Sequence, residues 1–416
     1  MPTIKIAQFS DLHYCPNHLE EADRCFTAGV TEAISRGVDA VIITGDSTDH
    51  ALDAHSPATR ALAAQLKRLS RVCPVLMLQG TFSHEPPGFL RMISMVNEKY
   101  PISVADGISQ WALVPNAGFI QLRGHDVESS ATMVVSAMPT LNKAAVASLC
   151  EGVVDAASEH ARGIISGIIR GWADFHLEQR RQGRATVVLS HGTVFNSISE
   201  HGVPMAGTDH ELGVDTLFGS QANAVMLGHI HKHQQWEEGG RVIAYPGSIG
   251  RFHHGEIGEK GWIEWTINTL SSEQDAMEEG TSLDFVPTPS RKNVDIVFDG
   301  PPDLDVIKAR AVECEGAYVR IQYAVDEEYR HNVDRAAIRL ILEKAADLKI
   351  EGKILIVTRQ RAQGISTVSM GDKLRLWATV TGTPDVDALG ERLQLLETTP
   401  ASEIAEALVA KVTAVA

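Results

Sequence analysis

The stretch Val225-Met226-Leu227-Gly228-His229-Ile230-His231 is the best guide to the fold, because an apolar run ends there in a glycine and two histidines. Alternate residues of a β-strand share a face, so His229 and His231 are predicted to point the same way from a buried strand end. Gly228 would leave room for a close ligand. Two imidazoles placed in this way form a chelate, although an isolated His-x-His also occurs in ordinary turns.

Four upstream runs that read as buried strands end in the same kind of residue. They cover residues 4–9, 38–44, 74–79 and 185–190, and they lead to Asp11 and His13, to Asp46, to Ser83 and His84, and to His191. Helical patterns at about 20–35 and 56–70 separate the first three. Strands that alternate with helices indicate an α/β fold, whose ligands gather at the carboxyl ends of the strands.

Length and composition indicate a globular protein of about two or three domains, with 416 residues and 44% apolar content. No apolar run reaches the roughly eighteen residues that a membrane span needs. The first residues begin a strand and lack the pattern of a signal peptide. Five cysteines without metal or disulfide spacing are typical of a reducing cytosol. We therefore expect a cytoplasmic protein without a membrane segment.

The formal net charge of −16 argues against a protein that simply coats nucleic acid. It does not exclude an enzyme that acts on nucleic acid. A cluster of carboxylates and histidines becomes locally positive once it holds divalent cations.

The polar strand ends together suit metal ions. Imidazole and carboxylate ligands favour manganese, zinc or iron over calcium or magnesium alone, and there are more of them than one ion needs. Two divalent ions about 3.5–4 Å apart and bridged by a shared carboxylate would stabilise in-line displacement at phosphorus. They would also lower the pKa of a bridging water, which supplies the attacking hydroxide. We expect manganese first, with magnesium, zinc or iron as alternatives.

The same residues carry a resemblance to a known family, through Asp11-x-His13, Gly45-Asp46, a glycine-initiated motif ending in His84-Glu85, His191, and Gly228-His229-x-His231. Together they resemble the five motifs of the calcineurin-like metallophosphoesterases. The run 229–234 and Tyr245-Pro246-Gly247-Ser248 are similar to one branch, SbcD, the nuclease subunit of the SbcC–SbcD DNA repair complex. The resemblance covers about residues 1–365.

This resemblance implies a four-layer αββα sandwich, with a smaller α/β capping domain toward the C-terminus. It implies one metal held by Asp11, His13, Asp46 and His231, and a second held by Asp46, His191, His229 and the residue that matches the family asparagine. Asp46 would then be the bridge. His84 would contact the scissile phosphate, as a proton donor or as an orienting group.

The third motif departs from the family pattern. The family has Gly-Asn-His followed by Asp or Glu, whereas this chain has Gly80-Thr81-Phe82-Ser83-His84-Glu85, which is two residues longer and lacks asparagine. We assign Ser83 to the asparagine position, with Thr81, Glu85 or water as alternatives. A hydroxyl is a weaker ligand than an amide carbonyl, so the second ion is expected to bind loosely. The loop could also have lost its metal contact.

Three parts are predicted along the chain: a phosphoesterase domain at 1–275, a capping domain at 285–365 and a helical extension at 366–416. The capping domain is predicted to have strands at 294–298, 317–323 and 352–359 and helices at 303–314 and 334–346. Two helical stretches are expected in the extension. The last of them is amphipathic, with Ile404, Leu408 and Val412 on one face.

The predicted function is that of an SbcD-like exonuclease and endonuclease acting on DNA. The extension would dock an SMC-type ATPase of the SbcC kind, and we expect a homodimer. Arg251, Arg359 and Arg361 are candidate DNA contacts, each with a structural alternative. Cys15 is expected to be a packing thiol and His50 a solvated or packed side chain, while Asp49 would orient ligands or cap a turn.

Two alternatives stay open. One is a phosphodiesterase for small molecules or cyclic nucleotides, although the long C-terminal extension argues against it. The other is a non-catalytic scaffold that binds DNA or a partner through a weakened metal site.

Overall fold

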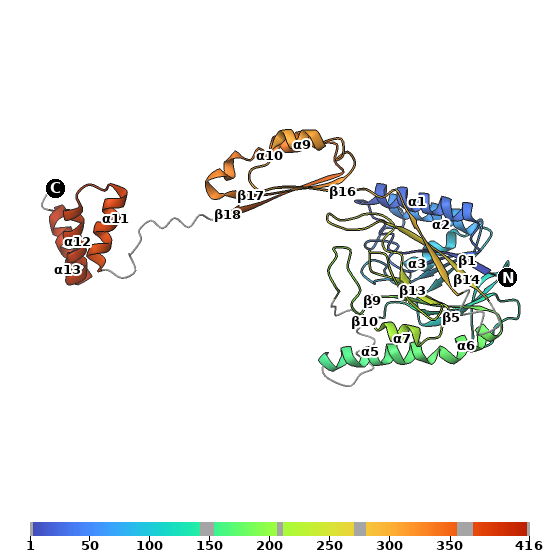
Figure 1. The fold of residues 1–416 in the computed structure, drawn as a ribbon. Helices are drawn as coiled ribbons and strands as arrows, with labels where there is room; N and C mark the ends of the chain where they lie inside the picture. Colours follow the sequence, from blue (N-terminus) through green and yellow to red (C-terminus); the bar gives the residue numbers. More distant parts are fainter. Residues whose placement is uncertain (1–2, 142–153, 206–210, 270–279, 356–368, 414–416) are drawn as a thin grey trace. The chain divides into compact units, whose positions relative to one another are not determined.

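The computed structural model describes residues 3–141, 154–205, 211–269, 280–355 and 369–413. Its strands and helices confirm the predicted α/β class (Figure 1). Two large sheets dominate the part that carries the motifs.

The first sheet has six strands in the order β15-β14-β1-β2-β3-β4. Their bounds are Ser282–Pro287, Gly261–Asn268, Thr3–Phe9, Ala40–Ile43, Val75–Leu78 and Ile102–Ala105. The strands β1 to β4 are parallel, and β14 and β15 extend the sheet in antiparallel fashion. The carboxyl ends of β1, β2 and β3 therefore lie along one edge.

The second sheet has seven strands in the order β12-β13-β11-β8-β7-β5-β6. Their bounds are Gln234–Glu238, Arg241–Tyr245, Ala224–Gly228, Ala185–His191, Met133–Met138, Ser109–Val114 and Gly118–Gln121. Its central strands β13, β11, β8 and β7 are parallel. A short parallel pair, β9 (Thr193–Val194) with β10 (Glu211–Leu212), follows β8.

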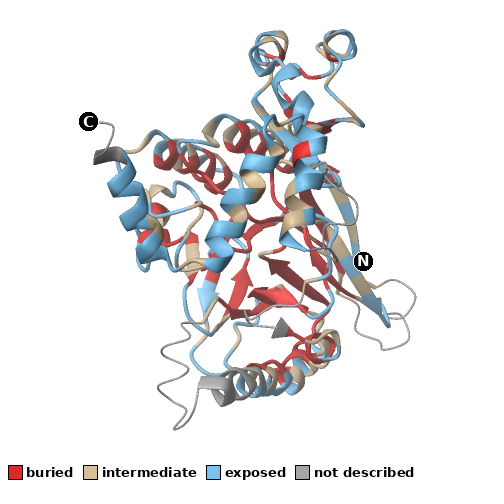
Figure 2. Ribbon diagram, turned by 90° about the vertical axis from the view of Figure 1, so that its left-hand side faces the viewer, coloured by how far each residue is buried: buried red, intermediate tan, exposed pale blue. Residues whose placement is uncertain are grey.

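Helices cover the outer faces of both sheets, which confirms the predicted sandwich. They are α1 (Leu19–Arg36), α2 (Pro57–Ser70), α3 (Phe89–Ile93), α5 (Val154–Gly171), α6 (Ala173–Arg181) and α7 (Val214–Phe218). Buried residues of both sheets share the central cluster, among them Ile6, Ile42, Val187 and Met226. Outer clusters join the first sheet to α1 and α2, and the second to α5 and α7. The helices turn their exposed faces outward (Figure 2).

Local sequence explains where the first two helices begin and end. Ser56 accepts the Thr59 N–H at 3.1 Å, and Pro57 occupies the first turn of α2, where its missing N–H costs nothing. Gly37 ends α1 in the left-handed conformation, with φ 67°. The Phe9 ring of β1 meets the Phe26 ring of α1 edge-on at 5.2 Å. Such contacts fix the strands whose ends carry the motifs.

A third sheet has the order β16-β17-β18, with bounds Asn293–Phe298, Tyr318–Asp326 and Asp347–Leu355. Helices α9 (Leu304–Arg310) and α10 (Arg335–Ile341) accompany it. β18 begins five residues before the predicted strand, and α10 ends before the predicted helix does. Gly316 donates to the Lys344 carbonyl and Ala346 to the Ala317 carbonyl, so the chain joins β17 where the pattern predicts a last helical turn.

The extension has three described helices rather than the predicted two: α11 (Met370–Thr381), α12 (Val386–Thr398) and α13 (Ala401–Thr413). Asp385 has a positive φ of 59°, which interrupts the helical conformation between α11 and α12. Ile404 and Leu408 lie on α13 as predicted, whereas the side chain of Val412 lies outside the described residues.

The chain divides into two compact units. The first contains Met1–Ile296, Leu304–Ile321 and Arg335–Ile350, and the second contains Val297–Asp303, Gln322–Asp334 and Glu351–Ala416. The domain boundaries drawn from the sequence stay predictions. Within the described residues, no helix combines the length and apolarity that crossing a membrane requires. The described cysteines Cys15, Cys25, Cys73 and Cys314 are free thiols.

Candidate metal centre

The candidate ligands follow five parallel strands at the edge where both sheets end. The strands β1, β2 and β3 lead to Asp11 and His13, to Asp46, and to His84, while β8 ends at His191 and β11 leads to His229 and His231. Backbone hydrogen bonds fix the first two loops together. The Asp11 N–H donates to the Gly45 carbonyl and the His13 N–H to the Asp46 carbonyl, both at 3.1 Å.

Four candidate ligands have left-handed backbone, with φ of 49° at Asp11, 45° at His13, 51° at Asp46 and 102° at His229. They make up half of the eight non-glycine residues with positive φ in the described parts of the chain. This conformation costs about 1–3 kcal/mol per residue and collects at functional sites.

The same backbone corrects the prediction that His229 and His231 point the same way from a strand end. β11 ends at Gly228, before either histidine. The loops then direct His229 and His231 to different groups of donor atoms.

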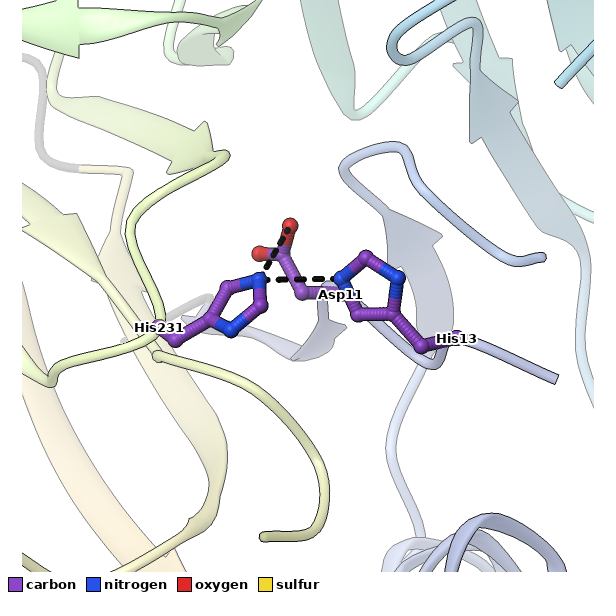
Figure 3. Close-up of side chains that lie close together, drawn as sticks. All are labelled: Asp11, His13 and His231. Atoms are coloured by element: carbon purple, nitrogen blue, oxygen red, sulfur yellow. Dashed lines mark hydrogen bonds and ion pairs between the residues drawn. The ribbon is translucent and has the colours of Figure 1, made fainter. Parts of the chain in front are cut away.

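Asp11, His13 and His231 form the first of these groups (Figure 3). Nε2 of His13 lies 2.9 Å from Nε2 of His231, which lies 3.9 Å from Oδ1 of Asp11. The Nδ1 atoms of both histidines are buried without a hydrogen-bond partner. Burial, and then the charges of His13 and Lys260, lower the pKa of His231 well below its ordinary value. His231 is therefore neutral at pH 7, the form in which imidazole binds a metal.

Asp46, His191 and His229 form the second group. Nε2 of His191 lies 3.3 Å from Oδ2 of Asp46, while Nδ1 lies 2.7 Å from the Thr44 carbonyl and donates to it. This contact fixes the ring with Nε2 toward the centre. Burial alone would lower the pKa of His191, but the charge of Asp46 outweighs it and raises the pKa to about 10. A divalent cation at this place would balance the buried carboxylate as that proton does.

Asp46 belongs to both halves of the centre. Its carboxylate is grouped with His191 and His229 on one side and with His13 and His84 on the other. Burial raises the pKa of Asp46, but His191 and His84 lower it well below the ordinary value, so it stays ionised. A buried, charged carboxylate between two sets of imidazoles suits a bridging ligand.

His84 lies on the open side of the group. Its side chain is 31% exposed, against 2% for Asp46 and 4% for His13. Nδ1 of His84 lies 2.7 Å from Oδ2 of Asp46, and this hydrogen bond raises the pKa of His84. The ring is thus placed where a substrate could reach it, with a proton that the carboxylate stabilises.

Thr81, rather than the predicted Ser83, lies at the second group. The Thr81 N–H donates to Oδ1 of Asp46 at 2.6 Å, and its hydroxyl lies 3.2 Å from Oδ2 and 3.4 Å from Nε2 of His191. The side chain of Ser83 is exposed. The physical reason is a tight turn directly after β3, in which the N–H groups of His84 and Glu85 donate to the Thr81 carbonyl. This turn brings Thr81 to Asp46 and leaves the Ser83 side chain facing solvent.

Glycines let the two sheet ends approach each other. A Cβ on Gly228 would lie 1.9 Å from the Thr44 carbonyl oxygen and 2.5 Å from Oγ of Ser10. A Cβ on Gly80 would lie 2.3 Å from the Asp46 N–H nitrogen. The space beside Gly228, predicted to admit a ligand, is therefore filled by the other sheet.

Two further buried residues support the centre: Glu85, which the sequence analysis considered only as an alternative ligand, and Lys260, which it missed. Glu85 accepts the Ser47 N–H at 2.5 Å and the Gly80 N–H at 2.6 Å, and burial raises its pKa to about 7. Its place at the end of the third motif was an available signal. Lys260 donates to the His231 carbonyl at 2.8 Å and pairs with Glu256 at 2.6 Å. Nothing in the sequence around Lys260 distinguishes it from a surface lysine.

Of the three arginines predicted to contact DNA, the structure describes Arg251. Arg251 is buried and donates to the carbonyls of Arg291 and Gly258, which favours its structural alternative. Arg359 and Arg361 lie outside the described residues.

Comparison with known proteins agrees with this geometry. The sequence profile described as "Calcineurin-like phosphoesterase" matches residues 4–233, which include all the candidate ligands. No curated protein sequence matches the chain.

Similar solved structures include GAP50, the anchor in the inner membrane complex of Plasmodium, and a dimetal phosphatase from Danio rerio. The first has 11% identity and a TM-score of 0.40, over 70% of this chain and 86% of that one. The second has 9% identity and a TM-score of 0.39, over 68% and 99%.

Proposed function

Because the chain belongs to the calcineurin-like phosphoesterase family, we propose that it is a two-metal phosphodiesterase whose substrate is DNA. The observation that carries the proposal is the position of Asp46. This ionised, buried carboxylate stands between two groups of histidines that come from both sheets.

The donor set fits two divalent ions, with manganese as our first choice. Asp11, His13, Asp46 and His231 would hold one ion, and Asp46, Thr81, His191 and His229 the other. Once bound, the pair would supply stabilisation of the charge on the phosphate oxygens and a water molecule of lowered pKa.

The chain's own groups would do the remaining work. His84, hydrogen-bonded to Asp46 on the open side, would hold a proton near the scissile phosphate. The Thr44 carbonyl, which accepts from Nδ1 of His191, would keep Nε2 directed at the second ion. Thr81 combines a hydroxyl and an N–H toward Asp46, so it would both contact the second ion and orient the bridge.

Support for DNA comes from the motifs similar to the SbcD branch. In the run 245–248, the Tyr245 hydroxyl donates to the Gly192 carbonyl at 2.6 Å, directly after His191. The Ser248 N–H donates to the His231 carbonyl at 3.3 Å. The residues that distinguish the branch thus brace two loops that carry candidate ligands.

The described surface of the helical extension supports a partner. Leu396, Leu408 and Val409 are 68%, 59% and 64% exposed, which is unusual for large apolar side chains. We propose that these helices dock an SMC-type ATPase of the SbcC kind, in a cytoplasmic complex built on a homodimer.

A phosphodiesterase for small molecules is the second candidate. Two observations favour it: the net charge is −16, and Arg251 is engaged by backbone carbonyls. An enzyme for small diesters needs no extended basic surface.

The test is cleavage of linear and hairpin DNA by the full chain with manganese, with and without chelator, beside a generic aryl phosphodiester. We expect manganese-dependent cleavage of DNA that Asp46→Ala abolishes and the exposed control Asp53→Ala retains. Hydrolysis of the aryl diester without any DNA cleavage would support the second candidate. Near-normal cleavage by Asp46→Ala would contradict the bridging role.

A further inference from the structure

A second cluster of metal-binding side chains lies beside the candidate centre. The parallel pairing of β1 with β2 continues past the first ligands, because the Tyr14 N–H donates to the Ser47 carbonyl at 3.1 Å and the Asp49 N–H to the Tyr14 carbonyl at 3.3 Å. Tyr14 and Thr48 form a parallel bridge. This register makes Cys15 a neighbour of Asp49 and His50.

Donor atoms of these three residues face one another. The Cys15 sulfur, an oxygen of Asp49 and a ring nitrogen of His50 all lie within 4.8 Å of each other. Cys15 is buried, whereas the side chains of Asp49 and His50 are 37% and 50% exposed. The cluster is therefore closed at the thiol and open toward solvent, which leaves a position for water.

An independent observation concerns the atom that faces Asp49 from the other side. Nδ1 of His13 is buried without a hydrogen-bond partner, in a side chain that is 4% exposed, and it lies 3.5 Å from Oδ1 of Asp49. The other oxygen, Oδ2, lies 3.4 Å from Nδ1 of His50. Asp49 thus stands between His13 and His50, with one oxygen toward each.

We propose that Cys15, Asp49 and His50 form a third metal site, of the kind that zinc prefers. Thiolate, imidazole and carboxylate are the usual zinc ligands, and three protein ligands with one open position are a common zinc arrangement. An ion there would hold Asp49 in place to accept a hydrogen bond from Nδ1 of His13, and so orient that ligand of the main centre. Cys15 and His50 then have a role beyond packing and solvation.

The thiol makes this site separately measurable, because none of the candidate ligands of the main centre is a cysteine. The full chain, stripped of metal, is titrated with cobalt(II), whose bond to a thiolate gives an intense charge-transfer absorption in the near ultraviolet. We expect this band in the wild-type protein and in Cys73→Ser, which alters another buried thiol. We expect no band in Cys15→Ser.

His50→Ala guards against a folding defect in Cys15→Ser, because His50 is half exposed. This variant should weaken the cobalt titration that produces the band by more than about tenfold, the least that loss of a direct ligand should cost. Zinc content after dialysis should fall by one ion per chain in both variants. A wild-type protein without the band, or a band unchanged in His50→Ala, would overturn the third site. Neither result depends on whether the substrate is DNA.

Discussion

At the scale of single residues, the centre depends on groups that the sequence identifies by type and on contacts that it does not reveal. Asp11, His13, Asp46, His191, His229 and His231 could be collected because each follows a strand pattern, and the structure groups all of them. Thr81 could not be preferred over Ser83, since the choice depends on the backbone hydrogen bonds of the tight turn that contains both residues. Lys260 could not be found, because burial of a lysine is a property of the fold.

The contacts of Thr81 lead to the first prediction. Thr81→Val removes the hydroxyl that lies between Asp46 and His191, so binding of the weaker manganese ion should loosen by about tenfold. Ser83→Ala is the matched control and should leave both binding steps unchanged, because that side chain is exposed. Isothermal titration with manganese would measure this. The reverse pattern would restore Ser83 as the ligand.

His84 gives the second prediction. If it handles a proton at the substrate, His84→Ala should lower turnover by about 10²–10⁴-fold while manganese stoichiometry stays unchanged. Metal analysis and steady-state kinetics on the same preparation would separate the two effects. Loss of metal together with activity would make His84 a ligand.

His191 gives the third prediction, through its pKa of about 10. Below that pH, His191 in the metal-stripped protein keeps a proton that a bound cation must displace. Manganese binding should therefore release about one proton at pH 8, and affinity should rise with pH up to about 10. Calorimetry in buffers of different ionisation enthalpy would count the proton, and His191→Asn should not release it. Affinity independent of pH would contradict the assignment.

The raised pKa of His191 also affects the stability of the metal-stripped protein. A histidine whose pKa rises from 6.5 to about 10 on folding contributes stability that is fully present below pH 6.5 and is lost as the pH rises toward 10. Urea unfolding in the presence of chelator should therefore show a free energy of unfolding that decreases from pH 6.5 to about pH 10.

At the scale of elements, the strands were predictable because parallel strands buried on both faces read as apolar runs. The ends of those strands were not, since φ turns positive at His229 and directs His229 and His231 to different groups of donor atoms. The late part of the third sheet shows the same limit. Hydrogen bonds that join residues 344–346 to Gly316 and Ala317, just before β17, start β18 early, and the local sequence pattern does not indicate such a partner.

The meeting of β11 with the loop after β2 gives the fourth prediction. Gly228→Ala places a Cβ where the Thr44 carbonyl oxygen already lies, so it should lower the free energy of unfolding by about 3 kcal/mol or more. Gly167→Ala, on α5 with no atom near the added methyl, should be neutral or stabilise by about 0.5–1 kcal/mol. Urea unfolding of both variants tests this. Equal stabilities would mean that the sheet ends are not in close contact.

At the scale of the whole molecule, the two sheets each supply part of a centre that neither could form alone. Asp11, His13 and Asp46 come from the first sheet, and His191, His229 and His231 from the second. The sequence predicts this meeting only through the family resemblance, because local sequence patterns do not indicate which face of one sheet packs against the other. The substrate and the partner of the extension stay predictions that rest on motifs and exposed apolar side chains.

The most direct test of the two-metal centre is an anomalous diffraction map from crystals of the full chain grown with manganese. We predict two manganese peaks about 3.5–4 Å apart with the Asp46 carboxylate between them. One peak should contact Asp11, His13 and His231, and the other His191 and His229. A single peak, or two peaks of which only one touches Asp46, would contradict the account.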